Sequence, residues 1–213
     1  MKSQYFKHLI YVVASLLALQ DTSARSPKRE VVFESECSCR GNHGVSRWAA
    51  KTDLAEPPAT SGDIHSVTPS QIFEWQGPSG DIPRGAGRMA AENEWYAITG
   101  RIKKVNVEDD GDLHLVLGDA SGDKPGEVVV EIPLGERWCV LRKLVFSWTD
   151  AVFPFATGRS PFRLVGDHVI RATGKAFYDV DHSENETRSN RRSDKKLAVW
   201  EIHPVMRLEV VDR

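Results

Sequence analysis

The sequence has few cysteines, no excess of one charge sign and no apolar run long enough to span a membrane. Three cysteines in 213 residues are too few for a disulfide-built scaffold. The 28 lysine and arginine residues nearly balance the 30 aspartate and glutamate residues. The resulting net charge of -2 gives no reason to expect strong binding to nucleic acid or anionic membranes. With 40% hydrophobic residues, the chain has enough apolar side chains for a core, which excludes a disordered chain.

Several catalytic and nucleotide-binding signatures are also missing. The sequence has no G-x-S-x-G elbow, no H-E-x-x-H helix, no P-loop and no glycine-rich dinucleotide turn. These absences favour a non-catalytic protein over an enzyme, and they leave the question of catalysis open.

The first 24 residues have the layout of a secretory signal peptide. Lys2 and Lys7 form a basic start, an uncharged apolar run covers residues 9–19, and residues 22–24 supply the small side chains needed for cleavage. The apolar run is shorter than the ~20 residues that span a bilayer, so we expect cleavage near Ala24 rather than a membrane anchor. The protein is then secreted or periplasmic and has no stable membrane span after cleavage.

Export changes the interpretation of the cysteines, because disulfides persist outside the cytoplasm. Cys37 and Cys39 form a C-x-C pair, and Cys139 lies far along the chain. We favour a bridge from Cys37 or Cys39 to Cys139 over a strained ring between Cys37 and Cys39, and one thiol is left over. A zinc site made by Cys37, Cys39 and His43 is a weaker alternative, since thiolate zinc sites usually have C-x2-C spacing.

The chain after residue 24 divides into two parts. Residues 25–93 are rich in proline, glycine and serine without sustained periodicity, which predicts a loop-rich arm with one or two short elements, such as one near Gln71 to Trp75. Trp48 and Trp75 indicate that this arm packs against another surface. Residues 94–213 have strong strand signals and form the predicted domain.

The order of elements in this domain predicts a small barrel. Strand patterns cover residues 94–107, 113–117, 127–132, 168–178, 197–203 and 206–211, and apolar residues at helical spacing from Trp138 to Val152 predict a helix over 137–152. Three strands, a helix and closing strands are the order of the OB-fold. We therefore predict a mainly β fold: an OB-fold-like five-stranded Greek-key barrel with one helix between strands three and four, preceded by the arm. An open α+β sandwich is the alternative.

Several segments resemble a known family. They are RWAAKTD (47–53), DGDLHLVLGD (110–119), VVVEIP (128–133), ATGKAFYDVDH (172–182) and WEIHPV (200–205). On these motifs, over roughly residues 45–211, the chain resembles a family of uncharacterised bacterial proteins with a D-G-D-x-H-L-V-L strand and a late E-x-H-P-V. The resemblance implies a bacterial protein but no particular activity, because none is established for the family. The loop before the last strand tends to be short and glycine-rich in that family. In this chain the corresponding loop, residues 183–196, is long, polar and basic.

Two histidines and two glutamates on predicted strands are candidate metal ligands: His114, Glu131, Glu201 and His203. Glu201 and His203 share one face of their strand, while Trp200 and Ile202 face the core. The second, third and fifth strands of an OB-fold lie near one another, so the four side chains can converge. Such a set suits zinc or another borderline divalent ion, and a metal-bound water would make the protein a metal-dependent hydrolase. The commoner alternative is two strand histidines hydrogen-bonded to carboxylates, without a cofactor.

An acidic turn precedes the second predicted strand. Asp109, Asp110 and Asp112 surround Gly111 there, and their oxygens could hold calcium. Capping of a tight turn by the same carboxylates is the favoured interpretation.

The loop after the fourth strand is the second candidate site. Its residues are Asp181, His182, Arg188, Arg191, Arg192, Lys195 and Lys196. OB-folds bind ligands between the loops that follow strands one and four, and basic side chains suit a phosphate backbone or an acidic polysaccharide. The interleaved acidic residues instead favour a solvated loop. We therefore expect an exported, non-catalytic OB-like binding module whose ligand is a protein, a polysaccharide or a nucleic acid, with the metal-dependent hydrolase as the alternative.

Overall fold

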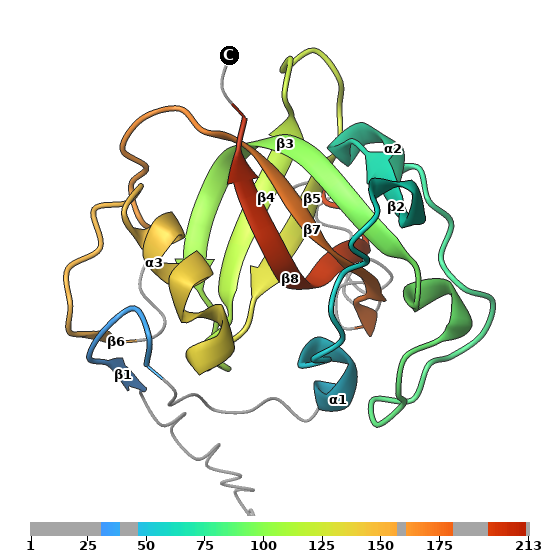
Figure 1. Ribbon diagram of the computed structural model, residues 1–213, viewed down its shortest axis with the longest axis horizontal. Coiled ribbons are helices and arrows are strands. Elements are labelled where there is room, and N and C mark those ends of the chain that lie inside the picture. The colour runs from blue at the N-terminus through green and yellow to red at the C-terminus, as the bar shows by residue number, and fades with distance from the viewer. Residues whose placement is uncertain (1–30, 39–46, 157–160, 181–195, 212–213) are drawn as a thin grey trace, which may run out of the picture.

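The fold is a closed five-stranded barrel with an extended arm packed on it. The computed structural model describes residues 31–38, 47–156, 161–180 and 196–211. The barrel strands are β3 (Trp95–Val107), β4 (Leu113–Asp119), β5 (Glu127–Ile132), β7 (Val169–Tyr178) and β8 (Trp200–Val210). They follow one another in the order β3-β4-β5-β8-β7, and pairing of β3 with β7 closes the barrel (Figure 1). The β5–β8 pair is parallel and the other pairs are antiparallel, which confirms the predicted OB-like barrel.

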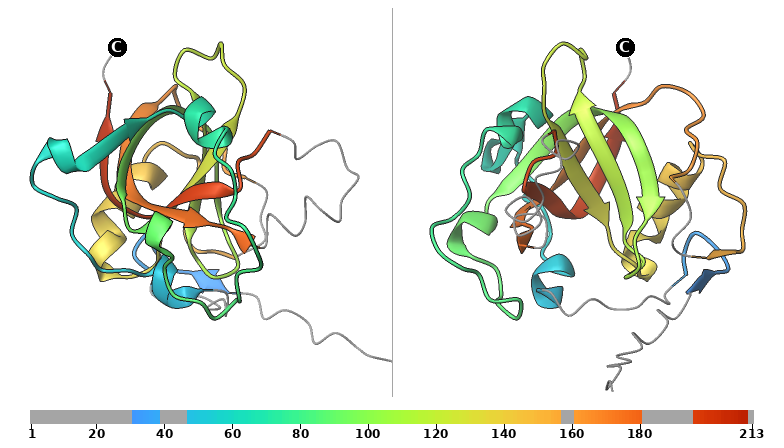
Figure 2. Two further views of the ribbon diagram at one scale, coloured as in Figure 1. Left: turned by 90° about the vertical axis from the view of Figure 1, so that its right-hand side faces the viewer. Right: turned by 180° about the vertical axis from the view of Figure 1, so that it is seen from behind.

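Alternation along the strands builds the core. In β4, Leu113, Leu115 and Leu117 are fully buried members of the apolar cluster inside the barrel. The intervening His114 and Val116 point to the opposite face, because successive strand residues alternate sides. The view from behind shows β3, β4 and β5 side by side (Figure 2). The outer face of this part of the barrel is therefore where polar side chains of β4 and β5 meet.

The last strand continues through a proline. We predicted two segments, 197–203 and 206–211, whereas β8 runs without a break from Trp200 to Val210. The pairing of β8 with β7 shifts register on both sides of Gly174, opposite the cis His203–Pro204 bond. These shifts mark a bulge beside Pro204, which lets one strand pass a residue that cannot donate to the ladder.

Gly174 permits the close approach of β7 to this bulge. A Cβ at residue 174 would clash with the carbonyl oxygen of Pro204 and lie 2.7 Å from Cγ2 of Ile202. We expect Gly174→Ala to lower the free energy of unfolding by about 2 kcal/mol, as measured by urea denaturation. Gly85→Ala, where a Cβ meets nothing within 4 Å, is the matched control and should have little effect. Equal stabilities of the two variants would contradict this role of Gly174.

The predicted helix is present but shorter than expected. A 3-10 turn (Glu136–Trp138) leads into α3 (Cys139–Phe146), so the prediction that the helix extends to residue 152 is wrong. Trp138, Val145 and Trp148 are buried as the helical stripe predicts, whereas Val152 is 71% exposed. After Phe146 the chain turns back, and Val165 donates its backbone N–H to the carbonyl of Trp148. The apolar spacing continued past the point where the helix hydrogen bonds end.

The arm consists of short elements distributed around the barrel. They are β1 (Val32–Phe33), α1 (Trp48–Lys51), a 3-10 turn (Ser61–Asp63), β2 (Ile64–Val67), α2 (Pro69–Phe73) and a 3-10 turn (Ala90–Glu92). β1 pairs with β6 (Phe155–Ala156), and β2 extends the barrel sheet as a strand parallel to β3. A capping box between Thr68 and Gln71, with Pro69 at the first helical position, starts α2. The predicted loop-rich arm is therefore more structured than its sequence indicated.

A disulfide links the arm to the barrel domain. Cys37 is bonded to Cys139, the first residue of α3, across 102 residues of sequence. Of the alternatives left open above, this is the bridge from Cys37, so neither the Cys37–Cys39 ring nor a zinc site that needs the Cys37 thiolate is present. Cys39 and His43 lie outside the described residues.

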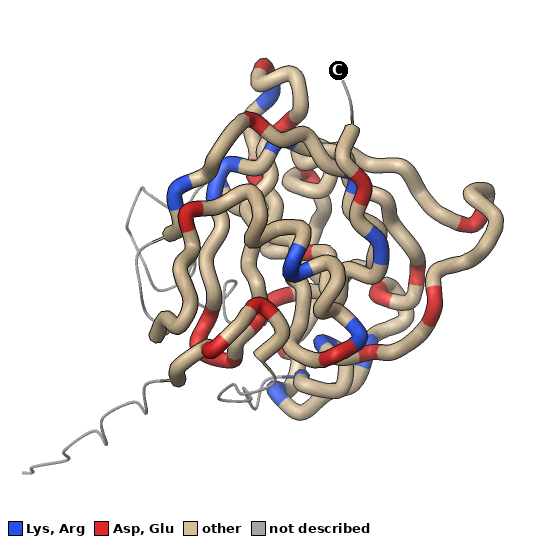
Figure 3. The backbone as a smooth tube through the Cα atoms, turned by 60° about the vertical axis from the view of Figure 1, so that its left-hand side comes forward, with Lys and Arg blue, Asp and Glu red and all other residues tan. Residues whose placement is uncertain are grey.

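Charged residues of both signs are intermixed along the chain. Figure 3 shows Lys and Arg interspersed with Asp and Glu over the described part of the chain, in keeping with the small net charge. In the described part of the chain, no helix is both long and apolar enough to cross a membrane. The predicted signal peptide (residues 1–24) lies outside the described residues.

Candidate metal site on the outer face of the barrel

Five ionisable residues lie on one face of three neighbouring strands. They are Asp112, the residue before β4, His114 in β4, Glu131 in β5, and Glu201 and His203 in β8. His114 is directly opposite Glu131, and Val130 is opposite Ile202, so the residues next to Val130 and Ile202 share the outer face. All five are buried, with exposed fractions between 0 and 7%. Burial of so many ionisable groups is costly unless they pair with one another or with an ion.

Glu131 lies at the centre of this cluster. His114 Nδ1 is 2.9 Å from its Oε1, in a hydrogen bond, and His203 Nδ1 is 2.8 Å from its Oε2. Lys51, the last residue of α1, places its Nζ 4.0 Å from the same Oε2 and 3.5 Å from Asp110 Oδ2. One carboxylate therefore faces three cationic or protonatable groups.

His203 lies between two carboxylates. Its Nε2 is 3.2 Å from Asp112 Oδ2, on the side of the ring opposite Glu131. Although these distances are short, Asp112 Oδ2, Glu131 Oε2 and both ring nitrogens of His203 are buried without a hydrogen bond of acceptable direction among the described residues. Ligand atoms of Asp112, Glu131 and His203 all lie within 4.8 Å of one another. Two buried carboxylates and an imidazole that converge in this way offer donor types that can hold a cation.

The electrostatics of the cluster favour the charged forms of His203 and Glu131. Burial opposes ionisation of His203, but the charges of Glu131 and Asp112 outweigh it and raise the pKa to about 9. Burial likewise opposes ionisation of Glu131, yet the His203 charge and the hydrogen bond from His114 hold its pKa well below the usual range. Burial, together with the charge of Asp112, raises the pKa of Asp110 to about 6.

Two further groups respond to the same carboxylates. Burial lowers the pKa of Lys51 and of His114, but Glu131 outweighs it, and both pKa values are raised overall. Glu201 contributes to both shifts through its charge, which places it within the electrostatic reach of Lys51 and His114. The cluster therefore balances several negative carboxylates against Lys51 and the two imidazoles.

We expect the metal-free protein to become less stable as the pH rises from 6.5 to 9. The pKa of His203 is about 9 in the folded chain and 6.5 for an ordinary histidine. Because the folded state holds this proton more tightly, the stabilisation is complete below pH 6.5 and is lost as the pH rises through 9. The loss should be of the order of 3 kcal/mol. Urea unfolding in EDTA should show it, and His203→Gln should remove it. A wild-type stability that is constant over this range would contradict the charged form of His203.

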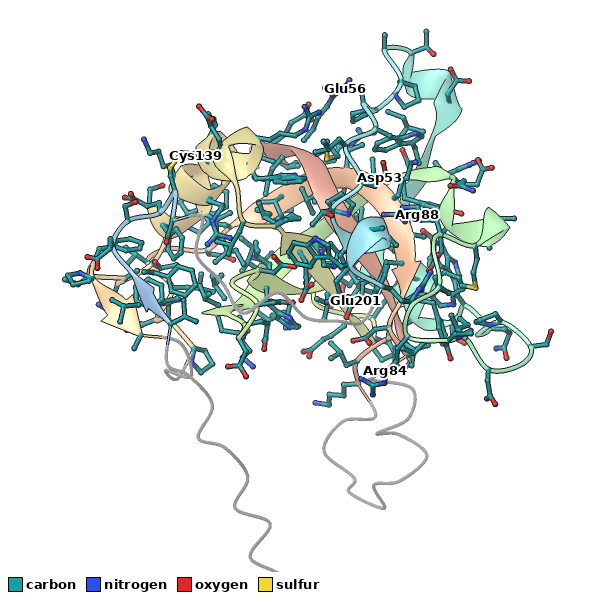
Figure 4. All side chains as sticks on the ribbon, turned by 90° about the horizontal axis from the view of Figure 1, so that it is seen from below. Asp53, Glu56, Arg84, Arg88, Cys139 and Glu201 are labelled. Carbon is teal, nitrogen blue, oxygen red and sulfur yellow. A yellow bond between two sulfur atoms is a disulfide. The ribbon has the colours of Figure 1, made fainter. Side chains whose placement is uncertain are left out.

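The arm covers the cluster from outside the barrel. Arg88 donates to the backbone carbonyls of Ala50 in α1 and His203 in β8, and its Nε is 3.1 Å from Asp53 Oδ2. In the view from below, Asp53 and Arg88 lie next to α1, and Glu201 lies close to the same helix (Figure 4). The guanidinium of Arg88 thus holds α1, with Lys51 at its end, against the bulged part of β8.

The structure brings together most of the predicted metal ligands and adds one. His114, Glu131 and His203 are in contact as a chain of two imidazoles around one carboxylate, and Glu201 lies on the same face. The tightest group of three nevertheless contains Asp112, which the sequence analysis assigned to the acidic turn. The signal for Asp112 was its two-residue spacing from His114, which places both on one side of the chain entering β4.

The second candidate site falls mostly outside the described residues. The residues outside are Asp181, His182, Arg188, Arg191, Arg192 and Lys195. Ligand binding by this loop therefore stays a prediction. Lys196 is described, and its backbone carbonyl accepts the N–H of Glu127 at the start of β5. That bond anchors the end of the loop to the barrel beside β5.

Comparison with known proteins gives no match: no protein-family model, no curated protein and no solved structure is significantly similar to this chain. The resemblance to the bacterial family with the late E-x-H-P-V motif therefore stays an expectation. Any function has to be argued from the cluster itself.

Proposed function

We propose that this chain is an exported, non-catalytic OB-like binding module whose ligand is a divalent metal ion held by Asp112, Glu131 and His203. The observation that supports it is the set of four buried atoms without aligned hydrogen bonds: Asp112 Oδ2, Glu131 Oε2 and the two ring nitrogens of His203. An ion bound here would replace the proton on one ring nitrogen of His203 and would be coordinated by carboxylate oxygens that are otherwise buried without an aligned hydrogen bond.

The donor set favours zinc among the common divalent ions. One imidazole nitrogen and two carboxylate oxygens are established zinc ligands, whereas calcium and magnesium prefer oxygen ligands alone. His114 would not bind the ion itself. Its hydrogen bond to Oε1 orients the Glu131 carboxylate and leaves Oε2 to bind the ion.

The burial of the cluster supports binding over hydrolysis. A metal-dependent hydrolase needs an open coordination position that a substrate can reach. Here the three proposed ligands are 0–5% exposed, and α1 of the arm lies over their face of the barrel. A metal held there would stabilise the barrel and its arm, as structural zinc ions do.

Zinc titration of the purified protein tests this proposal. After removal of bound metals with a chelator, isothermal titration should show one zinc bound per chain, and the bound form should unfold at a higher temperature. Asp112→Asn and His203→Gln should each weaken zinc binding at least tenfold. Calcium and manganese, titrated in the same way, should bind more weakly than zinc.

His65→Gln is the matched control. The His65 side chain is 59% exposed, on β2, and pairs only loosely with Glu94 at 3.5 Å. The variant should bind zinc as the wild type does. If the wild type binds no zinc, or if His203→Gln binds it unchanged, the proposed metal site is wrong and the cluster is a buried ion-pair network.

A further inference from the structure

Arg142 of α3 joins the two segments that carry Asp112 and Glu131. Its side chain is fully buried. Its Nη1 donates to the carbonyl of Gly111, the residue before Asp112, at 3.0 Å, and to the carbonyl of Ile132, the residue after Glu131, at 3.0 Å. One guanidinium therefore fixes the distance between the backbones of two proposed ligands, although it contacts neither carboxylate in these bonds.

The same guanidinium is connected to the disulfide. Arg142 Nε donates to the carbonyl of Glu36 at 2.9 Å, and Glu36 precedes Cys37, which is bonded to Cys139 three residues before Arg142. The disulfide, the Glu36 carbonyl and the guanidinium form one connected unit. Figure 4 shows Cys139 at the start of α3, beside the arm segment that carries β1. The disulfide therefore adds a covalent link to the packing of Phe33 and the β1–β6 pairing, which hold this segment beside α3.

We infer that Arg142 is a positioning residue for the metal site and that the Cys37–Cys139 disulfide controls how firmly it holds Asp112 and Glu131, which makes metal binding sensitive to the redox state. This inference rests on the proposed function for its metal readout. The coupling of the disulfide to the Asp112 segment does not depend on any metal and can be tested in the metal-free protein.

The chemical step is ordinary thiol–disulfide exchange with a dithiol reductant. A thiolate of the reductant attacks one sulfur of the bridge, and the second thiol of the reductant then resolves the mixed disulfide. Two electrons pass to the protein, which gains two thiols, while the dithiol becomes a disulfide. The Glu36 segment then loses its covalent link to α3, and the pairing of β1 with β6 and the buried Phe33 are among the contacts that remain. The carbonyl of Glu36 is held less firmly against Arg142.

The Leu134 amide reports on the Asp112 segment without any metal. Leu134 donates its N–H to Asp112 Oδ1 at 3.4 Å in a buried bond, so its hydrogen exchange measures how well that segment is held. We expect Cys37→Ala with Cys139→Ala to accelerate exchange at Leu134 at least tenfold, with amides of β7 unchanged. Arg142→Met should have the same effect, and combining all three substitutions should add little. Cys39→Ala, which leaves the bridge intact, is the control and should change nothing.

Zinc affinity is the second readout on the same variants. Alanine replacements are used because thiols released by a reductant bind zinc themselves. The double cysteine variant and Arg142→Met should each weaken zinc binding at least tenfold, and Arg142→Lys should fall between Arg142→Met and the wild type.

Each outcome decides one part. Unchanged Leu134 exchange in the double cysteine variant, or acceleration that is equal throughout β7, would overturn the inference. Accelerated Leu134 exchange with unchanged zinc affinity would overturn the redox control and leave the proposed function standing. A wild type that binds no zinc while Leu134 still responds would overturn the proposed function and leave the coupling of the disulfide and Arg142 to the Asp112 segment standing.

Discussion

Replacement of Glu131 by alanine should be the most damaging single change in the cluster and should lower the free energy of unfolding by about 3–5 kcal/mol. Glu131 is the shared partner of His114, His203 and Lys51. Without its charge, His203 is fully buried with Asp112 as its remaining close carboxylate, and the ammonium of Lys51 loses a neighbour at 4.0 Å. Removal of one partner from a buried ion pair costs more than the pair itself contributes, because the other charge stays buried.

Two comparisons isolate the charge from the packing. Glu131→Gln keeps the shape of the side chain and one acceptor oxygen, so it should cost less than alanine while still abolishing most zinc binding. Glu127→Ala, four residues earlier on the same strand and only partly buried, is the matched control and should cost less than about 1 kcal/mol. Urea denaturation at pH 7 in EDTA measures all three. A loss below 1 kcal/mol for Glu131→Ala would mean that the cluster is not held together by this carboxylate.

The barrel could be predicted from the sequence because its signals are local. Alternation in Leu113 to Leu117 and the turn at Gly111 specify strand, face and reversal within a few residues. The order of strands and helix then limits the topologies to a few. Because the second, third and fifth strands of an OB-fold lie near one another, the sequence also predicted that His114, Glu131 and His203 can converge.

The rest of the site depends on contacts that are remote in sequence. Lys51 and Arg88 belong to an arm without periodicity, and nothing near them indicates that they face β8, which lies more than a hundred residues later. From the sequence, Arg142 is expected on the solvent-exposed face of its helix. It is instead fully buried, because four backbone carbonyls surround its guanidinium: those of Glu36, Gly111, Ile132 and Pro133. Such positions follow from the packed structure and not from the residue types around them.

The second large effect is expected at Glu92, the residue that fixes the start of α1. Glu92 and Arg47 are both buried; Arg47 Nη1 is 2.7 Å from Glu92 Oε1, and Nη2 contacts Oε2. The same carboxylate accepts the backbone N–H groups of Met89 and Tyr178 at 2.7 and 2.8 Å. Arg47 also donates to the carbonyl of Tyr178, the last residue of β7. One ion pair therefore holds α1, the segment before β3 and the end of β7 together.

Glu92→Ala should lower the free energy of unfolding by about 3–5 kcal/mol, because it leaves the buried guanidinium of Arg47 without its counter-charge and two buried amides without their acceptor. Replacing both partners by apolar residues, as in Arg47→Met with Glu92→Leu, should recover a large part of this loss, because no unpaired charge remains. The control is Glu94→Ala, which should change stability by less than about 0.5 kcal/mol. Glu94 pairs with His65, and both side chains are about 60% exposed.

Since Lys51 lies four residues after Arg47, loosening α1 should also uncover the cluster. Zinc should then bind Glu92→Ala faster than the wild type in stopped-flow measurements. An equally slow uptake by both proteins would show that α1 does not limit access to Asp112, Glu131 and His203.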